Sequence, residues 1–193
     1  MAGIYAFLGV VAGGSVILLR GNPLEYPEPW IELSPLASHS YSALVGVTLG
    51  IGLAVITPLL VARTKWAKTL QDELRPWAQG LSGHAIFWLA LLSSFAEELL
   101  FRSLLQPTTN LWVGAISFGL LHQVPGPARW IWVTWATIMG VVLGSLYAAT
   151  GSLVGPLLAH ALLNGMNLRH LRAHDDRPAT RALGGILGPV HPR

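Results

Sequence analysis

The sequence contains no cysteine and has little charge. The absence of cysteine excludes a disulfide-stabilised scaffold. Only 11% of the 193 residues are charged, less than half of the roughly 25% that a typical soluble domain carries. Hydrophobic residues make up 52% of the chain and the mean hydropathy is +0.53, which also excludes intrinsic disorder. This composition indicates an integral membrane protein.

The charge that is present is weakly basic, with 12 Lys and Arg against 9 Asp and Glu and a net charge of +3. No basic run is interleaved with aromatic residues, so nucleic acid is not an expected partner. In an apolar chain, such a balance is typical of loops that face the cytoplasm and anionic lipid. We therefore expect the lipid bilayer as a partner and no nucleic acid.

Apolar stretches of the chain predict an all-α fold, a polytopic transmembrane helical bundle with about six spans. A helix needs about 20 apolar residues to cross the hydrocarbon core. No basic residue precedes the first stretch, as it would in a signal peptide, so we expect this span to be retained. The spans are predicted at residues 1–19, 41–62, 83–105, 110–123, 129–150 and 152–168.

The distribution of Lys and Arg predicts the orientation of these spans. Short loops rich in positive charge stay in the cytoplasm, and ten of the 12 basic residues fall in segments that a six-span chain places on one side. We therefore expect a multi-pass protein of the bacterial inner (plasma) membrane with both termini in the cytoplasm. The ten residues are Arg63, Lys65, Lys68, Arg75, Arg129, Arg169, Arg172, Arg177, Arg181 and Arg193.

The chain divides into three predicted parts. Residues 1–80 contain two N-terminal transmembrane helices and an interfacial linker helix. Residues 81–168 form a core of about four transmembrane helices. Residues 169–193 form a polar, basic cytoplasmic tail that is too rich in Gly and Pro to cross the membrane.

Within the linker, Trp66, Leu70 and Leu74 recur four residues apart, with charged residues on the other faces. This pattern predicts a short amphipathic helix in the membrane interface, and the alternative is a plain connecting loop. We expect Pro76 to end the helix, because the residue before a proline is disfavoured in helical geometry.

Pairs of glycines four residues apart predict close contacts between transmembrane helices. Such pairs concern packing and not chemistry. They are Gly9/Gly13, Gly46/Gly50, Gly140/Gly144 and Gly151/Gly155.

The third span carries three charged residues, Glu97, Glu98 and Arg102. Each costs about 2.5 to 3.5 kcal/mol to place at the centre of a span, so their presence requires a reason. Glu98 and Arg102 are four apart and can pair along one helix face. Glu97 points about 100° away from Glu98 and stays without that partner. A structural ion pair therefore accounts for Glu98 and Arg102, but it leaves Glu97 unexplained.

Two histidines also fall within predicted spans, His122 and His160. Alone, each is more typical of an interhelical hydrogen bond than of catalysis. At a rise of 1.5 Å per residue, Glu97 lies about 21 Å from the inner edge of its span, and His160 and His122 lie about 12 and 18 Å from the outer edges of theirs. We therefore expect the three side chains to lie at similar depths, nearer the outer face, and to be able to meet.

Three segments together resemble the motifs of the CPBP family, which comprises type II CAAX prenyl endopeptidases and bacteriocin-processing or immunity (ABI) relatives. The segments are E-E-L-L-F-R at Glu97–Arg102, F-G-L-L-H at Phe118–His122 and H-A-L-L-N at His160–Asn164. They are similar to the family's E-E-x-x-x-R, F-x-x-x-H and H-x-x-x-N/B motifs. The resemblance covers about 82–168, and three motifs in order are far more specific than one.

The resemblance implies an intramembrane endopeptidase with a buried Glu/His/His/Asn site. By position, Glu97 corresponds to the general base that activates water, and His122 to a residue that shares or orients that water. His160 and Asn164 are one helical turn apart and correspond to the pair that binds the carbonyl oxygen and stabilises the oxyanion. Donors aimed at a developing oxyanion in a dry site contribute several kcal/mol to catalysis.

The resemblance also implies that Glu98 and Arg102 support Glu97 by fixing its position and charge. The family has been described both as metal-dependent and as glutamate proteases, and the H-E-x-x-H zinc signature is absent. We favour no cofactor. If a metal is present, we expect Zn held by Glu97, His122 and His160.

The expected partner is a membrane-anchored protein or peptide substrate, cut near its C terminus or membrane segment. The family's range includes CAAX-type processing and C-terminal sorting signals, and the depth of the site favours an exported or membrane-anchored substrate. The main alternative is a non-catalytic immunity or scaffold protein of the same fold. A proton-coupled carrier is a third hypothesis, but no inverted repeat supports it.

Overall fold

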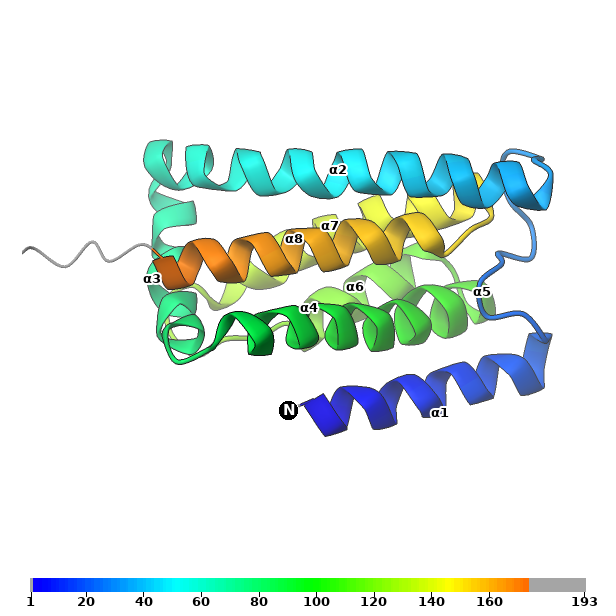
Figure 1. Ribbon diagram of the computed structural model, residues 1–193, viewed down its shortest axis with the longest axis horizontal. Helices are drawn as coiled ribbons and strands as arrows, with labels where there is room; N and C mark the ends of the chain where they lie inside the picture. Colours follow the sequence, from blue (N-terminus) through cyan, green and yellow to red (C-terminus); the bar gives the residue numbers. More distant parts are fainter. Residues whose placement is uncertain (1, 174–193) are drawn as a thin grey trace, which may run out of the picture.

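The computed structural model describes residues 2–173, and these residues form a bundle of helices (Figure 1). The predicted all-α membrane bundle is confirmed. Its helices are α1 (Ala2–Arg20), α2 (Pro35–Arg63), α3 (Lys65–Gln79), α4 (Gly83–Glu98), the π-helix η1 (Leu99–Leu105), α5 (Gln106–Thr108), α6 (Leu111–Leu121), α7 (Arg129–Thr150) and α8 (Val154–Ala173).

Four segments of the described chain are long and apolar enough to cross a membrane, judged by length and composition. They are α1, α2, the continuous segment Gly83–Thr108 and α7. The other two predicted spans do not meet this description. Helix α6 has 11 residues and is therefore only about 16 Å long. Helix α8 has 20 residues but lies between α2 and α4 (Figure 1), so protein covers much of its surface in place of lipid.

The predicted linker helix exists as α3 and crosses one end of the bundle (Figure 1). The prediction that Pro76 ends this helix is wrong, because Pro76 lies inside α3 and the helix continues to Gln79. A proline within a helix removes one backbone hydrogen bond. Beyond Pro76, Ala78 is fully buried, and this packing stabilises the last turn. A position in the membrane interface stays a prediction.

The predicted tail begins later than residue 169. Arg169 and Arg172 belong to the last turns of α8, which ends at Ala173. The remainder of the predicted tail, residues 174–193, lies outside the described residues.

Glycines bring α8 into close contact with α2, and such close contacts between helices are what the small-residue spacing predicted. A side chain on Gly46 of α2 would overlap the backbone of Gly155 in α8. A Cβ on Gly140 of α7 would lie 2.8 Å from Cα of Ala115 in α6. Gly151 has a different role, since its φ of 73° ends α7 in the left-handed conformation that glycine adopts without strain.

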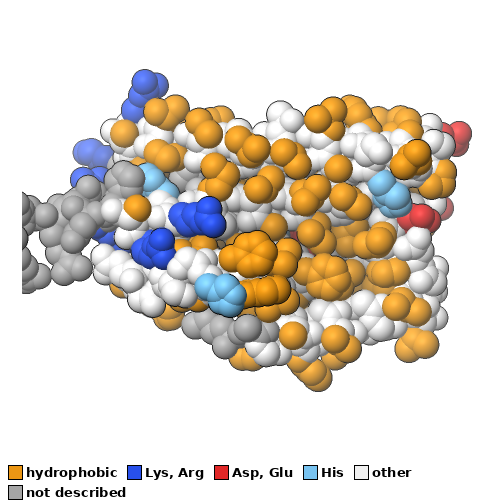
Figure 2. Space-filling model, viewed as in Figure 1, with side chains coloured by type: hydrophobic (Ala, Val, Ile, Leu, Met, Phe, Trp, Pro, Cys, Tyr) orange, Lys and Arg blue, Asp and Glu red, His pale blue; other side chains and the backbone are white. Residues whose placement is uncertain are grey.

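The two ends of the bundle differ in charge. On the face that Figure 2 shows, Lys and Arg side chains gather at the end where α3 lies, Asp and Glu side chains lie at the opposite end, and hydrophobic side chains cover the surface between. The acidic residues Glu25, Glu28 and Glu32 belong to the α1–α2 loop. Helix α1 begins and α8 ends on the α3 side (Figure 1). We call this the basic end.

Candidate active site

Glu97 and Glu98 occupy the last turn of α4, and the backbone then widens into the π-helix η1. Arg102 lies in η1, and its Nε is 3.3 Å from Glu98 Oε2, so the predicted pairing is found. The side chains of Glu98 and Arg102 are 0% and 2% exposed. Short π-helical segments frequently occur at functional sites. The sequence pattern predicts a continuous α-helix over this stretch and gives no sign of η1.

His122 directly follows α6, with non-helical backbone angles (φ −90°, ψ 63°). Its Nδ1 lies 2.7 Å from the carbonyl oxygen of Phe118. A carbonyl oxygen only accepts hydrogen bonds, so Nδ1 carries the proton and donates it. The other ring nitrogen, Nε2, is 3.5 Å from Glu97 Oε2. The end of α6 therefore presents His122 to Glu97 in a defined tautomeric arrangement.

His160 reaches the same carboxylate from α8. Its Nδ1 lies 2.7 Å from Glu98 Oε1, and we assign the proton of this hydrogen bond to the histidine. Its Nε2 is 3.7 Å from Glu97 Oε2. The side chain of His160 is 6% exposed. Glu98 therefore orients His160 and is itself held by Arg102, in a buried chain of three side chains.

The structure thus brings together Glu97, His122 and His160, which the comparison of depths predicted could meet. Both imidazoles turn Nε2 toward one atom, Glu97 Oε2, which is buried and has no hydrogen-bond partner among the described residues. Asn164 lies one turn after His160 on α8 and lines the same cavity. Glu97, His122, His160 and Asn164 therefore lie at one site.

Phe118 is a site residue that the sequence assignment left out. Its ring centroid lies 4.2 Å from that of His122 and 5.7 Å from that of His160. The Arg102 guanidinium lies 4.2 Å from the same ring centroid, at cation–π distance. Phe118 therefore packs against both histidines and the buried cation. Its position as the first residue of F-G-L-L-H was the signal that could have identified it.

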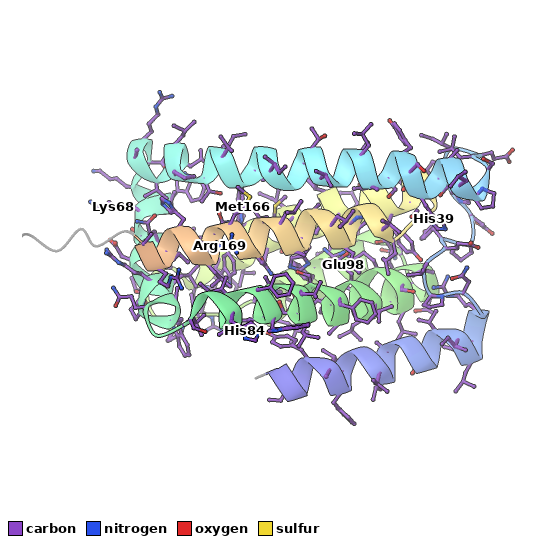
Figure 3. All side chains as sticks on the ribbon, viewed as in Figure 1. His39, Lys68, His84, Glu98, Met166 and Arg169 are labelled. Atoms are coloured by element: carbon purple, nitrogen blue, oxygen red, sulfur yellow. The ribbon has the colours of Figure 1, made fainter. Side chains whose placement is uncertain are left out.

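A cavity of about 340 Å³ is lined by Glu97, His122, His160 and Asn164. It is bounded by parts of α1, α2, α3, α4, α6, α7 and α8. Leu70 and Trp77 of α3 line it together with Glu97. The cavity therefore extends from the catalytic candidates to the basic end. In Figure 3, Glu98 lies in the interior near α4 and α8, whereas Lys68 and Arg169 lie at the α3 end. The depth of the site in the membrane, which the sequence places nearer the outer face, stays a prediction.

The donor atoms of the site decide whether it fits a metal ion. Across residues 2–173, no group of three or more His, Cys, Asp or Glu side chains is arranged to hold a metal ion. The Nδ1 atoms of both histidines are engaged, one with a carbonyl and one with a carboxylate, and their Nε2 atoms are directed at Glu97 Oε2. Metal-ligating histidines make the same outer hydrogen bonds, so the predicted trio of Glu97, His122 and His160 supplies suitable donor types but is not arranged as a metal-binding group.

Comparison with known proteins identifies one matching family and one curated relative. The family model described as type II CAAX prenyl endopeptidase Rce1-like matches residues 80–166. The uncharacterized protein YpbD of Bacillus subtilis is 32% identical over an alignment of 145 residues, and the alignment covers 68% of this chain and 76% of that protein. No solved structure matches. The family match includes every candidate site residue from Glu97 to Asn164.

Proposed function

The chain belongs to the type II CAAX prenyl endopeptidase Rce1-like family, and we propose that it is an intramembrane endopeptidase. We propose that it hydrolyses a peptide bond near the C terminus or the membrane segment of a membrane-anchored protein. The observation that carries this proposal is the convergence of His122 and His160 Nε2 on Glu97 Oε2, at 3.5 and 3.7 Å. The adjoining cavity of about 340 Å³ offers space for a peptide and a water molecule.

In this proposal Glu97 is the general base. Its Oε2 has no hydrogen-bond partner among the described residues and can therefore accept a hydrogen bond from water. His122 Nε2, 3.5 Å away, helps to orient that water. The water oxygen attacks the carbonyl carbon of the substrate while Glu97 takes a proton from the water. General base catalysis of this kind contributes about 10²- to 10⁴-fold to the rate.

His160 and Asn164 stabilise the oxyanion that this attack creates. Both side chains come from consecutive turns of α8 and line the cavity. The hydrogen bond of 2.7 Å from His160 Nδ1 to Glu98 fixes the ring and leaves Nε2 directed at the cavity. Fixed donors require no reorganisation during the reaction, and removing one such donor costs about 10²- to 10³-fold in kcat.

The buried ion pair keeps the proposed oxyanion donor in place. Arg102 Nε lies 3.3 Å from Glu98 Oε2, and Glu98 Oε1 lies 2.7 Å from His160 Nδ1. When the tetrahedral intermediate breaks down, the bond from carbon to nitrogen is cleaved and the proton held by Glu97 passes to the leaving amine. The products are a new carboxylate and a new amine.

The alternative is a non-catalytic immunity or scaffold protein of the same fold, in which the polar residues serve folding alone. Glu98 fits that description, since Arg102 and His160 bind it directly. Glu97 does not, because the two histidine nitrogens lie 3.5 and 3.7 Å from its Oε2 and that atom makes no hydrogen bond within the described chain. A carboxylate that is costly to bury and not held by a strong partner favours catalysis.

We propose a glutamate mechanism without a metal, because no three His, Cys, Asp or Glu side chains of residues 2–173 are arranged to hold a metal ion. Metal analysis of purified protein, before and after treatment with EDTA and 1,10-phenanthroline, tests this directly. We expect the purified protein to contain less than one zinc ion per molecule and to keep full activity after treatment with the chelators. Loss of activity that stoichiometric zinc restores would replace the glutamate mechanism with a metal-dependent one.

We further propose that the protein spans the bacterial plasma membrane with the basic end, and thus both termini, in the cytoplasm. The charge asymmetry in Figure 2 supports this orientation. Reporter fusions at residues 107–110 and after residue 193 test it. An exported reporter at the first site and a cytoplasmic reporter at the second are expected, and the reverse pattern would invert the orientation.

Cleavage by purified protein in liposomes tests the activity itself. The probes are a dansyl-labelled peptide that ends in a farnesylated CAAX sequence and the same peptide without the lipid. Glu97→Ala and His160→Ala are expected to fold and to lose cleavage. His84→Ala, which alters an exposed histidine on α4, is the matched control and is expected to keep it. Cleavage by Glu97→Ala at the wild-type rate would reject the proposed base.

A further inference from the structure

Helix α3 presents one polar side chain, Gln71, on its buried face. The other buried residues of this helix are apolar: Ala67, Leu70 and Ala78. Gln71 is 7% exposed and lines the same cavity as Glu97. A leucine at this position would match the neighbouring side chains and the amphipathic pattern of the helix. The sequence places a carboxamide in the cavity wall where helix packing alone favours an apolar residue.

The carboxamide is not accounted for by the packing of the protein. Gln71 Oε1 is buried and has no hydrogen-bond partner among residues 2–173. A buried acceptor without a donor costs about 1 to 3 kcal/mol. This side chain lines the same cavity as Glu97, so a ligand bound there lies beside the carboxamide and can supply the missing donor once the amide turns toward it. The feature is therefore an unpaired acceptor in the cavity wall.

A peptide substrate supplies the donor that this acceptor lacks. An extended peptide carries one N–H and one C=O per residue, and these groups require partners when they leave water. His160 and Asn164 are proposed to bind the scissile carbonyl, which leaves the neighbouring peptide groups unpaired. A glutamine side chain has one acceptor oxygen and two donor hydrogens, so it can pair with a peptide unit as another backbone segment would.

We propose that Gln71 binds the main chain of the peptide substrate by accepting a hydrogen bond from a backbone N–H of the peptide bound in this cavity. This proposal rests on the endopeptidase function proposed above and adds a substrate-binding residue from outside the three motifs. It makes α3 one wall of the substrate-binding cleft and places the bound peptide between α3 and Glu97. Because the contact is to the main chain, it acts on lipidated and unlipidated peptides alike.

Binding and cleavage are measured separately, so that the two proposals can fail separately. In the inactive Glu97→Gln protein in liposomes, the anisotropy of the dansyl-labelled peptides, with and without the farnesyl group, gives Kd. Adding Gln71→Leu is expected to raise Kd by about tenfold for both peptides, the equivalent of one hydrogen bond. In the otherwise wild-type protein, Gln71→Leu is expected to raise KM by a similar factor and to leave kcat within about twofold.

The matched control is Gln79→Leu, which changes the same residue type on the same helix at an exposed position and is expected to leave Kd unchanged. A second measurement separates substrate contact from a structural effect of Gln71. Replacing backbone amides of the peptide by esters, one at a time, removes one N–H each. One ester is expected to weaken binding about tenfold when Gln71 is present and to have no further effect in Gln71→Leu.

Each outcome decides the proposal. Equal Kd values with and without Gln71→Leu, additive ester effects, or the absence of saturable binding of either peptide would overturn it. Binding that depends on Gln71 without any cleavage by the wild-type chain would retain the binding site and reject the endopeptidase function. Cleavage with an unchanged KM in Gln71→Leu would retain the endopeptidase and reject the role of Gln71.

Discussion

Replacing Glu98 by glutamine is expected to lower the stability of the protein. Replacing Glu97 by glutamine is expected to abolish cleavage with little change in stability. Glu98 is fully buried, 2.7 Å from His160 Nδ1 and 3.3 Å from Arg102 Nε. In Glu98→Gln, the buried guanidinium of Arg102 loses its partner, which costs about 3 to 5 kcal/mol. In Glu97→Gln, no hydrogen bond to Oε2 is lost, so we expect the free energy of unfolding to change by less than about 1 kcal/mol.

The assay is reversible unfolding by SDS in mixed micelles, followed by tryptophan fluorescence, with cleavage measured on the same samples. Arg102→Met should be as destabilising as Glu98→Gln, because it leaves the carboxylate without its cation. The double variant Glu98→Gln/Arg102→Met removes one charge of each sign. Its loss of stability should be smaller than the sum of the two single losses by about 2 kcal/mol. It should stay inactive, because His160 still lacks its orienting carboxylate.

The exposed carboxylate Asp72 on α3 provides the control, since Asp72→Asn should alter stability by no more than about 0.5 kcal/mol. Strictly additive losses in the double variant would refute the buried pairing of Glu98 with Arg102. Equal destabilisation by Glu97→Gln and Glu98→Gln would refute the distinction between a catalytic and a supporting carboxylate.

Two further substitutions are expected to separate packing from chemistry. Gly46→Ala should lower the free energy of unfolding by about 1 to 3 kcal/mol, because the added methyl group would overlap α8. In Gly52→Ala, on the same helix, the methyl group meets no atom within 4 Å, so this control should be neutral or stabilising in the same unfolding assay. Phe118→Leu should lower kcat about tenfold or more by releasing the imidazoles it contacts, whereas Phe87→Leu at an exposed position should leave the cleavage rate unchanged.

The residues of the site could be predicted because their signals are local. A carboxylate in an apolar stretch is conspicuous wherever it lies, and a constant rise per residue converts sequence position into depth. These grounds alone indicate that Glu97, His122 and His160 can meet. The spacing of four pairs Glu98 with Arg102, and the π-helical backbone between them does not prevent that pairing.

What could not be predicted depends on contacts between distant segments. The apolar face of α3 is visible in the sequence, but the sequence does not show that this face covers the cavity lined by Glu97. Pro76 favours a helix end locally, and packing of Ala78 overrides that preference. The covered position of α8 likewise follows from its neighbours, so a helix of modest hydropathy can lie inside the bundle. The sequence likewise does not show that Gln71 is buried in the wall of this cavity.

The most direct test of the central claim is a comparison of protein termini in membranes from cells that carry either the wild-type chain or Glu97→Gln in place of it. Endopeptidase activity predicts a defined set of membrane-anchored proteins with new termini in the wild type and intact termini in the variant, at equal amounts of inserted protein. Identical termini in the two membranes would contradict the assignment of Glu97 as the base of an intramembrane endopeptidase.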